Sequence, residues 1–217
     1  MDLSNVTLVC IDDLAPDRAH ELLIDLNKSI YFKSSKLFCS EFSSKFSVRT
    51  PPIKSGKQYS EFVIKELYKY LNTDFCMVVQ TDGFFVNPDA WTDDFLNYDY
   101  IGAPWPDGGV GNGGFSIRSK SLLEFVSKHP FSSDPEFING KGLHPEDGRI
   151  CSDYRWGEKG LRAAGYTDAP TEIAQRFSIE GQTEITNETF GFHGKHTFKY
   201  NKYSLENDLF KSVKTYF

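Results

Sequence analysis

The sequence has few cysteines, no long apolar run and no excess of basic residues. The cysteines show no C-x-x-C pair, which disfavours a zinc site or a disulfide framework and predicts reduced, buried thiols. They are Cys10, Cys39, Cys76 and Cys151. The longest uninterrupted apolar run, Phe75–Val79, is far shorter than the roughly 20 residues of a membrane helix. Met1 is followed by Asp2 and not by a basic stretch and an apolar run, which disfavours a signal peptide. We therefore expect a cytoplasmic protein without a membrane span, in the host cytoplasm if a phage encodes it.

The charge balance is acidic, and the composition is that of a globular domain. The 217 residues include 24 Lys and Arg against 30 Asp and Glu, so the formal net charge is -6. This balance argues against a protein that coats nucleic acid or binds membranes through a polybasic surface. One Ser/Lys-rich region is an exception, and it is either a solvated face or a stripe that could meet DNA. Its basic residues are Lys33, Lys36, Lys45, Arg49, Lys54 and Lys57. The length corresponds to a single domain.

Apolar patterns and turn residues alternate along the chain in the manner of an α/β protein. The expected strands are Val6–Ile11, Lys36–Cys39, Lys45–Arg49, Phe75–Val79, Tyr98–Gly102, Phe115–Arg118 and Ile173–Phe177. The expected helices begin at Pro16 and at Asn87 (as the cap), and cover Lys57–Leu71, Leu122–Lys128 and Glu146–Lys159. Trp105–Gly114 reads as a loop and 129–144 as irregular. Phe75–Val79 is the best candidate for a central strand, because a strand that is buried on both faces is apolar throughout.

Two segments near this central strand could bind a ligand. Asp82 follows the strand directly, and in open α/β sheets ligands bind beyond the carboxyl ends of the strands. A carboxylate at that place can hold a hard cation that bridges phosphate oxygens. The alternative is a plain turn, since Thr81-Asp82-Gly83 is good turn chemistry. Gly111–Gly114 could bring backbone close to a ligand, or it could be only a tight connection between elements.

Two further segments carry titratable side chains. Glu146 and Asp147 open a helix, where the dipole favours their ionised form; an ionised Asp147 could act as a general base. Acidic first turns are common, so a structural role is the alternative. His193 lies between glycines in a segment that we expect to be irregular, with Lys195 beside it. A neutral imidazole there could bind a metal and the lysine could meet a phosphate, although a single histidine is more often structural.

The order acidic turn, glycine loop, Glu-Asp helix start and C-terminal histidine resembles the GT-A glycosyltransferases, which use nucleotide-sugar donors. The stretches Gln80–Phe84, Asn87–Trp91, Tyr98–Trp105 and Gly111–Ser119 look like a poorly characterised family of such enzymes. The resemblance covers about residues 55–196. It implies a Rossmann-like single domain, 1–217, with a central, mostly parallel mixed sheet flanked by helices. Residues 1–110 would mainly bind the nucleotide-sugar, and residues 111–217 would supply the acceptor side and the metal histidine.

The resemblance also implies roles for individual residues. Ile11 and Asp12 line the base pocket, while Gln80, Thr81 and Asp82 hold ribose, metal and diphosphate. Gly113 and Gly114 present backbone near the sugar and acceptor. Asp147 deprotonates the acceptor hydroxyl, and Glu146 positions hydroxyls. His193 completes the metal shell, and Lys195 stabilises the leaving diphosphate.

The chain departs from the GT-A pattern at one place, because Gln80 stands where an Asp-x-Asp motif has its first carboxylate. Binding of Mn²⁺ or Mg²⁺ then depends on Asp82 and His193, with donor phosphates and water as the other ligands. A base that acts on the acceptor favours inversion at the anomeric carbon. Asp107 is a candidate for the second carboxylate that a double displacement would need.

The expected function is transfer of a sugar, from a UDP-sugar by preference, to an acceptor hydroxyl. The acceptor is a glycan or a small molecule, with hydroxymethylated phage DNA as a minority option. One alternative is a non-catalytic nucleotide- or sugar-binding module, which would not need Asp147. The other is a metal-dependent phosphohydrolase, for which the five histidines are poorly spaced.

Overall fold

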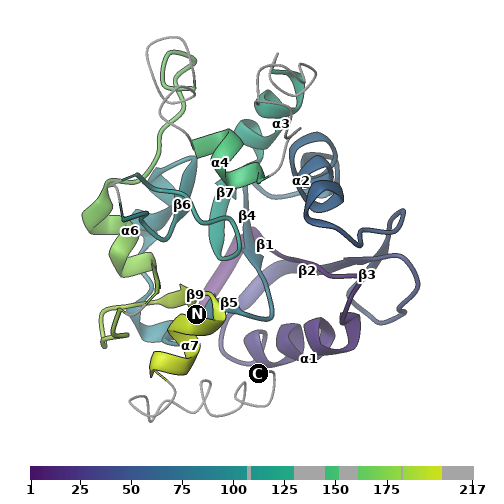
Figure 1. Cartoon of the computed structure of the whole chain (residues 1–217), viewed down its shortest axis with the longest axis horizontal. Helices are drawn as coiled ribbons and strands as arrows, with labels where there is room; N and C mark the ends of the chain where they lie inside the picture. The colour runs from purple at the N-terminus through teal and green to yellow at the C-terminus, as the bar shows by residue number, and fades with distance from the viewer. Residues whose placement is uncertain (107–108, 130–144, 152–160, 182, 202–217) are drawn as a thin grey trace.

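The large sheet of the molecule has six strands in the order β3-β2-β1-β4-β7-β6 (Figure 1). The computed structural model describes residues 1–106, 109–129, 145–151, 161–181 and 183–201. The six strands are β1 (Asp2–Ile11), β2 (Tyr31–Cys39), β3 (Ser47–Arg49), β4 (Phe75–Val79), β6 (Tyr100–Gly102) and β7 (Ser116–Ser119). The pairs β1–β2, β1–β4 and β2–β3 are parallel, whereas β4–β7 and β6–β7 are antiparallel. The predicted α/β class with a mixed sheet flanked by helices is therefore confirmed.

Helices and a smaller sheet cover the two faces of the large sheet. The helices are α1 (Pro16–Leu26), α2 (Gly56–Lys65), α3 (Lys120–Lys128), α4 (Glu146–Cys151), α6 (Thr171–Phe177) and α7 (Lys195–Asn201). Short 3-10 turns are η1 (Leu67–Tyr70), η2 (Pro88–Ala90) and η3 (Asp93–Asn97). The smaller sheet contains β5 (Gly83–Phe85), β9 (Gly191–His193) and β8 (Ser178–Glu180), in that order. Figure 1 shows α1 on one side of the large sheet and α2 and α3 on the other.

The central strand β4 is apolar throughout because both of its faces are covered. Cys76 and Val78 belong to a buried cluster with side chains of α2, η1 and α3. Met77 and Val79 belong to a second cluster, which includes the apolar face of α1 and the small sheet. Alternating side chains therefore enter two different cores, as expected for a strand inside a doubly covered sheet. The predicted bounds Phe75–Val79 match the structure at both ends.

Local capping explains where several helices begin. The Ser55 hydroxyl accepts a hydrogen bond from the Gln58 N–H at the start of α2, and the Ser119 hydroxyl accepts one from the Leu122 N–H at the start of α3. The predicted cap at Asn87 is wrong. Its side chain makes no capping bond, and its amide instead donates to the carbonyl of Asn187, 2.6 Å away. Only the short η2 follows, in place of a longer helix.

Other element predictions needed correction. Ile173–Phe177, predicted as a strand, lies within helix α6, and the strand β8 starts directly after it. Ala174 and Phe177, three positions apart, are the residues that α6 buries, which is helical spacing. The predicted helix Lys57–Leu71 is divided between α2 and η1. The predicted helix Glu146–Lys159 is described only as α4, and its remainder lies outside the described residues.

The predicted burial of the cysteines is confirmed, because all four thiols are buried. Within the part of the chain that the structure describes, no helix is both long and apolar enough to cross a membrane.

Candidate functional site

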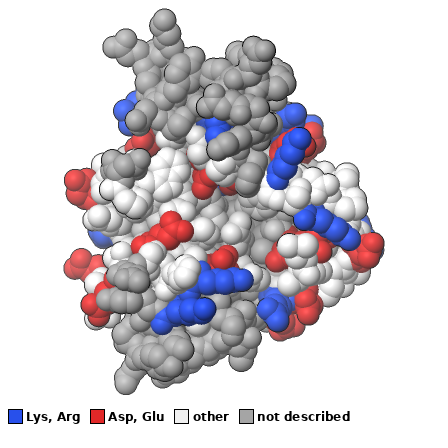
Figure 2. Space-filling model, viewed as in Figure 1, with Lys and Arg blue, Asp and Glu red and all other residues white. Residues whose placement is uncertain are grey.

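A cavity of about 420 Å³ opens where β1 and β4 end. It is lined by residues from segments that are far apart in the sequence. They are Ile11–Leu14, Ile53–Gly56, Tyr59, Gln80–Asp82, Gly114, Pro145–Asp147 and His193. Figure 2 shows both acidic and basic side chains around the hollow at the centre of this face. The acidic residues of the cavity lining are Asp12, Asp13, Asp82, Glu146 and Asp147.

The pairing of β1 with β4 brings the first two groups of predicted residues together. Cys10 is the partner of Val79 in this parallel pair, so Ile11–Asp12 and Gln80–Asp82 leave the sheet at the same edge. The Gln80 and Gly83 backbones exchange hydrogen bonds of 2.8 and 3.0 Å, with Thr81 and Asp82 between them. Asp82 is therefore in a tight turn, as one of the two interpretations predicts, and it also lines the cavity.

Asp12 has a structural task in addition to lining the cavity. Its Oδ1 accepts hydrogen bonds of 2.8 Å from the N–H groups of Leu14 and Ala15, which fixes the turn into α1. The second carboxylate oxygen does not take part in these bonds.

The small sheet places His193 opposite the acidic turn. Gly83 is the partner of His193 in the antiparallel pair β5–β9, and the Gly194 N–H donates to the Asp82 carbonyl over 2.6 Å. The histidine therefore stands at the end of a strand, contrary to the predicted irregular segment. Pairing across more than a hundred residues thus puts the two predicted metal ligands on one cavity wall.

The two ring nitrogens of His193 have different surroundings. Nδ1 lies 3.1 Å from Glu180 Oε1 and 3.1 Å from Asn112 Oδ1, and both of these atoms are acceptors. Asn112 also donates from its side-chain nitrogen to Glu180, which sets the orientation of its amide. The proton of a neutral His193 is therefore on Nδ1, and Nε2 remains as the acceptor.

Acidic neighbours control the ionisation of His193. Burial favours the neutral ring, but the hydrogen bond and charge of Glu180 outweigh burial, and Asp82 and Asp147 add to its effect. The pKa of His193 is therefore raised above its ordinary value. For Glu180, burial favours the protonated acid, yet the bonds from His193 and Asn112 hold its pKa below the ordinary value. A carboxylate that orients a histidine in this way is typical of metal-binding histidines.

Gly114 leaves the space that His193 and Gln80 occupy. A Cβ on Gly114 would lie 2.1 Å from His193 Nε2 and 2.7 Å from Gln80 Oε1. The glycine is therefore required by the two side chains that pack over it.

Gly113 is required by its neighbours in the same way. A Cβ there would lie 2.3 Å from Glu146 Oε1 and 2.5 Å from Arg118 Nη2. The Gly113 N–H donates to Asp147 Oδ2 over 2.9 Å, and Gly113 is not in the cavity lining. Its N–H is thus used inside the protein.

Asp147 and Glu146, on the first turn of α4, have unequal surroundings. Asp147 is partly exposed to the cavity, and its Oδ1 accepts a hydrogen bond of 2.7 Å from the Gly148 N–H. Glu146 is buried, and its Oε1 forms a 2.9 Å ion pair with the fully buried Arg118. Arg118 also donates to the Gly113 carbonyl over 3.2 Å, so this guanidinium joins α4 to the glycine loop.

The sequence did not identify several residues of this wall. Arg118 lies in an ordinary strand sequence, Ser-Ile-Arg-Ser, which carries no signal for a buried ion pair. Asp13 accepts hydrogen bonds from the N–H groups of Ser40 (2.6 Å) and Ile53 (2.7 Å), so it ties β1 to the segment before α2. Burial opposes ionisation of Asp13, but these bonds lower its pKa. Tyr59 lines the cavity from α2.

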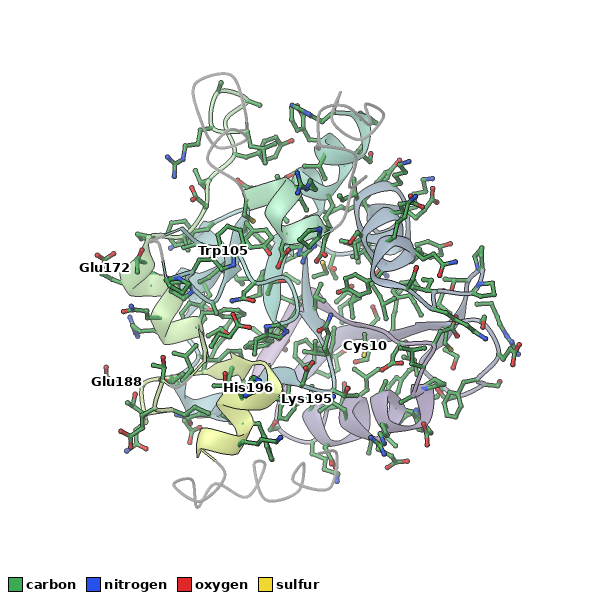
Figure 3. All side chains as sticks on the ribbon, viewed as in Figure 1. Cys10, Trp105, Glu172, Glu188, Lys195 and His196 are labelled. Carbon is green, nitrogen blue, oxygen red and sulfur yellow. The ribbon has the colours of Figure 1, made fainter. Side chains whose placement is uncertain are left out.

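Two predicted residues are not brought into the cavity lining. Lys195 is exposed on the first turn of α7, where Figure 3 labels it, and Gly113 lies behind Gly114. Asp107 lies outside the described residues. All other predicted site residues line the one cavity: Ile11, Asp12, Gln80, Thr81, Asp82, Gly114, Glu146, Asp147 and His193.

Comparison with known proteins places the chain in a family. Residues 43–193 match the model of the family described as protein of unknown function (DUF5672), and the chain belongs to this family. The matched part runs from the segment before β3 to His193, so it includes every predicted cavity residue except Ile11 and Asp12. No curated protein matches the sequence.

Proposed function

We propose that this DUF5672 chain is a glycosyltransferase of the GT-A type, which moves a sugar from a nucleotide-sugar to an acceptor hydroxyl. A UDP-sugar is the favoured donor. The observation that carries the proposal is the convergence of the acidic turn, Gly114, the Glu146–Asp147 pair and His193 on one cavity beyond the carboxyl ends of β1 and β4. Ligands of open α/β sheets bind at such an edge. The buried thiols agree with a reducing, cytoplasmic location.

The donor set of the cavity suits Mn²⁺ or Mg²⁺. Asp82 supplies carboxylate oxygen, and His193 offers Nε2 because Glu180 and Asn112 engage Nδ1. In the described residues no group of three or more His, Cys, Asp or Glu side chains is arranged to hold a metal. Asp82 and His193 would therefore hold the ion together with donor phosphates and water. When bound, the ion would supply positive charge to offset that of the diphosphate.

Asp147 is the proposed base. Its carboxylate takes the proton of the acceptor hydroxyl as the acceptor oxygen bonds to the anomeric carbon, and the bond from that carbon to the diphosphate oxygen breaks. The nucleoside diphosphate leaves with the bonding electrons, and the anomeric configuration inverts. The hydrogen bonds from Gly113 and Gly148 hold the carboxylate at the cavity wall. Lys195 has no part in this proposal, because it lies outside the cavity lining.

Donor binding is the first test. Isothermal calorimetry with UDP-, GDP- and TDP-sugars, with and without MnCl₂, should show a donor whose affinity rises with the metal. Asp82→Ala and His193→Ala should each abolish the metal-dependent part. The matched controls Asp89→Ala, an exposed acid outside the cavity, and His129→Ala should bind like the parent. Equal donor affinity with and without metal in the parent would refute the metal assignment.

Turnover is the second test, and it separates an enzyme from a binding module. Asp147→Asn should bind the donor normally, while the rate of transfer falls about 10²- to 10⁴-fold. A loss that came only from a displaced Gly113 loop would also change donor affinity. If this variant transfers sugar at the parental rate, the assignment of Asp147 as the base is wrong and the argument for inversion fails with it. A donor that binds without any transfer would favour the non-catalytic module.

A further inference from the structure

A second hollow lies on the side of α6 and is linked to the candidate site through the contact between Glu180 and His193. This groove has a volume of about 710 Å³ and is formed by the segment after β6, by α6 and by the segment around and after β8. We call it the α6 groove, and the side chains that matter here are Trp105, Glu172, Arg176, Glu180, Glu184 and Glu188. Figure 3 labels Trp105, Glu172 and Glu188 on this flank of the molecule.

We infer that the α6 groove binds the acceptor, and that this acceptor is an oligosaccharide without negative charge. The inference rests on the proposed function, because that function requires a second substrate next to the donor. It also decides among the acceptor classes that the sequence left open.

The groove is joined to the donor cavity through one residue. Glu180 lines the groove, and its carboxylate contacts His193 Nδ1 over 3.1 Å; His193 in turn lines the cavity. Asn112 donates to the same carboxylate. A substrate that lies in the groove therefore ends beside the wall where the proposed metal ligand stands, which is the position an acceptor must reach.

Trp105 supplies an apolar surface that is held in place. A Cβ on Gly111 would lie 2.1 Å from its Cζ2 atom, and a Cβ on Gly109 would lie 3.2 Å from its Cε3 atom. The indole thus packs directly on the backbone of the glycine loop, and these two glycines make that packing possible. The ring is partly buried and lines the groove. A large, pre-positioned aromatic surface suits the apolar C–H face of a sugar ring.

The charges of the groove define the ligand. Its described lining residues include four glutamates and one arginine, Arg176, so the lining has an excess of negative charge. Figure 2 shows acidic side chains along the edge of the molecule over α6 and the segment after β8. Carboxylates accept strong hydrogen bonds from sugar hydroxyls and repel phosphates, so the groove favours a neutral or amino-sugar chain over DNA.

The basic region that could have met DNA lies elsewhere. Its residues belong to β2, to β3 and the segments on either side of it, and to the start of α2, and none of them lines the α6 groove. Lys36 is engaged internally, since its Nζ donates to the Tyr70 carbonyl over 2.7 Å.

Binding to the full-length protein tests the inference. Calorimetric titrations would use maltohexaose, cellohexaose and N-acetylchitohexaose as neutral probes. Chitosan hexamer would serve as the cationic probe, and hexagalacturonate and a hydroxymethylcytosine duplex as anionic probes. At least one neutral or cationic probe should bind ten times or more tightly than either anionic probe. Trp105→Ala should weaken that binding at least tenfold, and Trp105→Phe less. The control Trp91→Phe, at a ring packed on Phe95 and Phe190, should bind like the parent.

Exposed groove residues give a variant that does not threaten folding. The double variant Glu184→Gln/Glu188→Gln should reduce the preference for the non-anionic probe at least threefold, whereas Glu21→Gln on α1 should not. The inference is overturned if no neutral or cationic saccharide binds, if an anionic probe binds equally well, or if both Trp105 variants bind like the parent.

Failure of the proposed function would look different. Trp105 lies outside the donor cavity, so its variants should keep the parental affinity for the nucleotide-sugar found in the donor screen. If saccharides bind in the groove but no donor is found, the glycosyltransferase proposal fails and the saccharide site remains. If a donor binds and only DNA is glycosylated, the acceptor inference fails and the proposed function remains.

Discussion

Substitution of Gly114 with alanine adds only one methyl group, but it should disrupt the candidate site. The new methyl group would lie 2.1 Å from His193 Nε2, whereas ordinary contact begins at 3.4 Å. The imidazole would have to move by about 1.3 Å, the difference between these two distances. Its Nδ1 is already held 3.1 Å from both Glu180 and Asn112, so the ring cannot yield freely.

The expected cost follows from overpacking. Adding a methyl group to a well-packed site typically costs about 1–3 kcal/mol of unfolding free energy. For a chain of this length, that corresponds to a fall in Tm of roughly 2–12 °C. If His193 is displaced, the proposed metal-dependent donor affinity should fall on the order of tenfold or more, because the ligand geometry is lost.

A neighbouring glycine provides the control. A Cβ on Gly148, in α4 beside Asp147, would meet only Pro145 Cγ at 3.4 Å, an ordinary contact. Gly148→Ala should therefore keep or slightly raise the Tm, since alanine favours a helix by up to about 1 kcal/mol over glycine. Differential scanning calorimetry and Mn²⁺ titration would measure both variants. If Gly114→Ala matches the parent in Tm and in metal affinity, His193 does not pack on Gly114 as described.

Three further predictions concern two ion pairs and the thiols. Arg118→Leu leaves Glu146 buried without its partner and should lower the unfolding free energy, measured in urea, by about 3–5 kcal/mol. The double variant Arg118→Leu/Glu146→Leu should lose less than this single variant. An equal or larger loss in the double variant would count against a coupled pair. The pKa of His193 is raised, so its contact with Glu180 stabilises the metal-free protein most when the ring is protonated. This contribution to the unfolding free energy is fully present below the ordinary pKa of 6.5 and is lost as the pH rises through the raised pKa. Glu180→Gln should therefore destabilise more at about pH 6 than at about pH 9, and should lower the His193 pKa measured by NMR; an unchanged NMR titration would contradict the contact. Burial raises the pKa of Cys76 to about 12, and the other three thiols are buried as well. DTNB should therefore react with none of the thiols in the native protein and with all four in urea. Rapid reaction in the native protein would contradict their burial.

The elements and residues that the sequence predicted correctly are those with a local physical cause. Phe75–Val79 is a short apolar run bounded by polar residues, so its strand could be placed to the residue. Asp82 follows that strand after two residues, so its place at the edge of the sheet follows from chain order alone. Glu146 and Asp147 were expected at a helix start because acidic residues favour the positive end of the helix dipole.

The errors also have a common cause. Ile173–Phe177 contains apolar residues at positions that suit either a strand or one helical turn, and only its packing selects the helix. The strands β5, β8 and β9 have three residues each, too few to show a period, and β5 pairs with β9 across more than a hundred residues. His193 was therefore expected in an irregular segment.

The sequence by itself determined the α/β class, the central strand, the buried thiols and the candidates for carboxylate and imidazole chemistry, because each depends on residue type and short-range spacing. Only the tertiary structure decided which candidates share a wall. The β5–β9 pairing sets His193 against the acidic turn, and the buried Arg118 joins Glu146 to the glycine loop. The packing over each glycine likewise explains why Gly111, Gly113 and Gly114 carry no side chain. These contacts join segments far apart in the chain, and such long-range pairing leaves no periodic signal in the sequence.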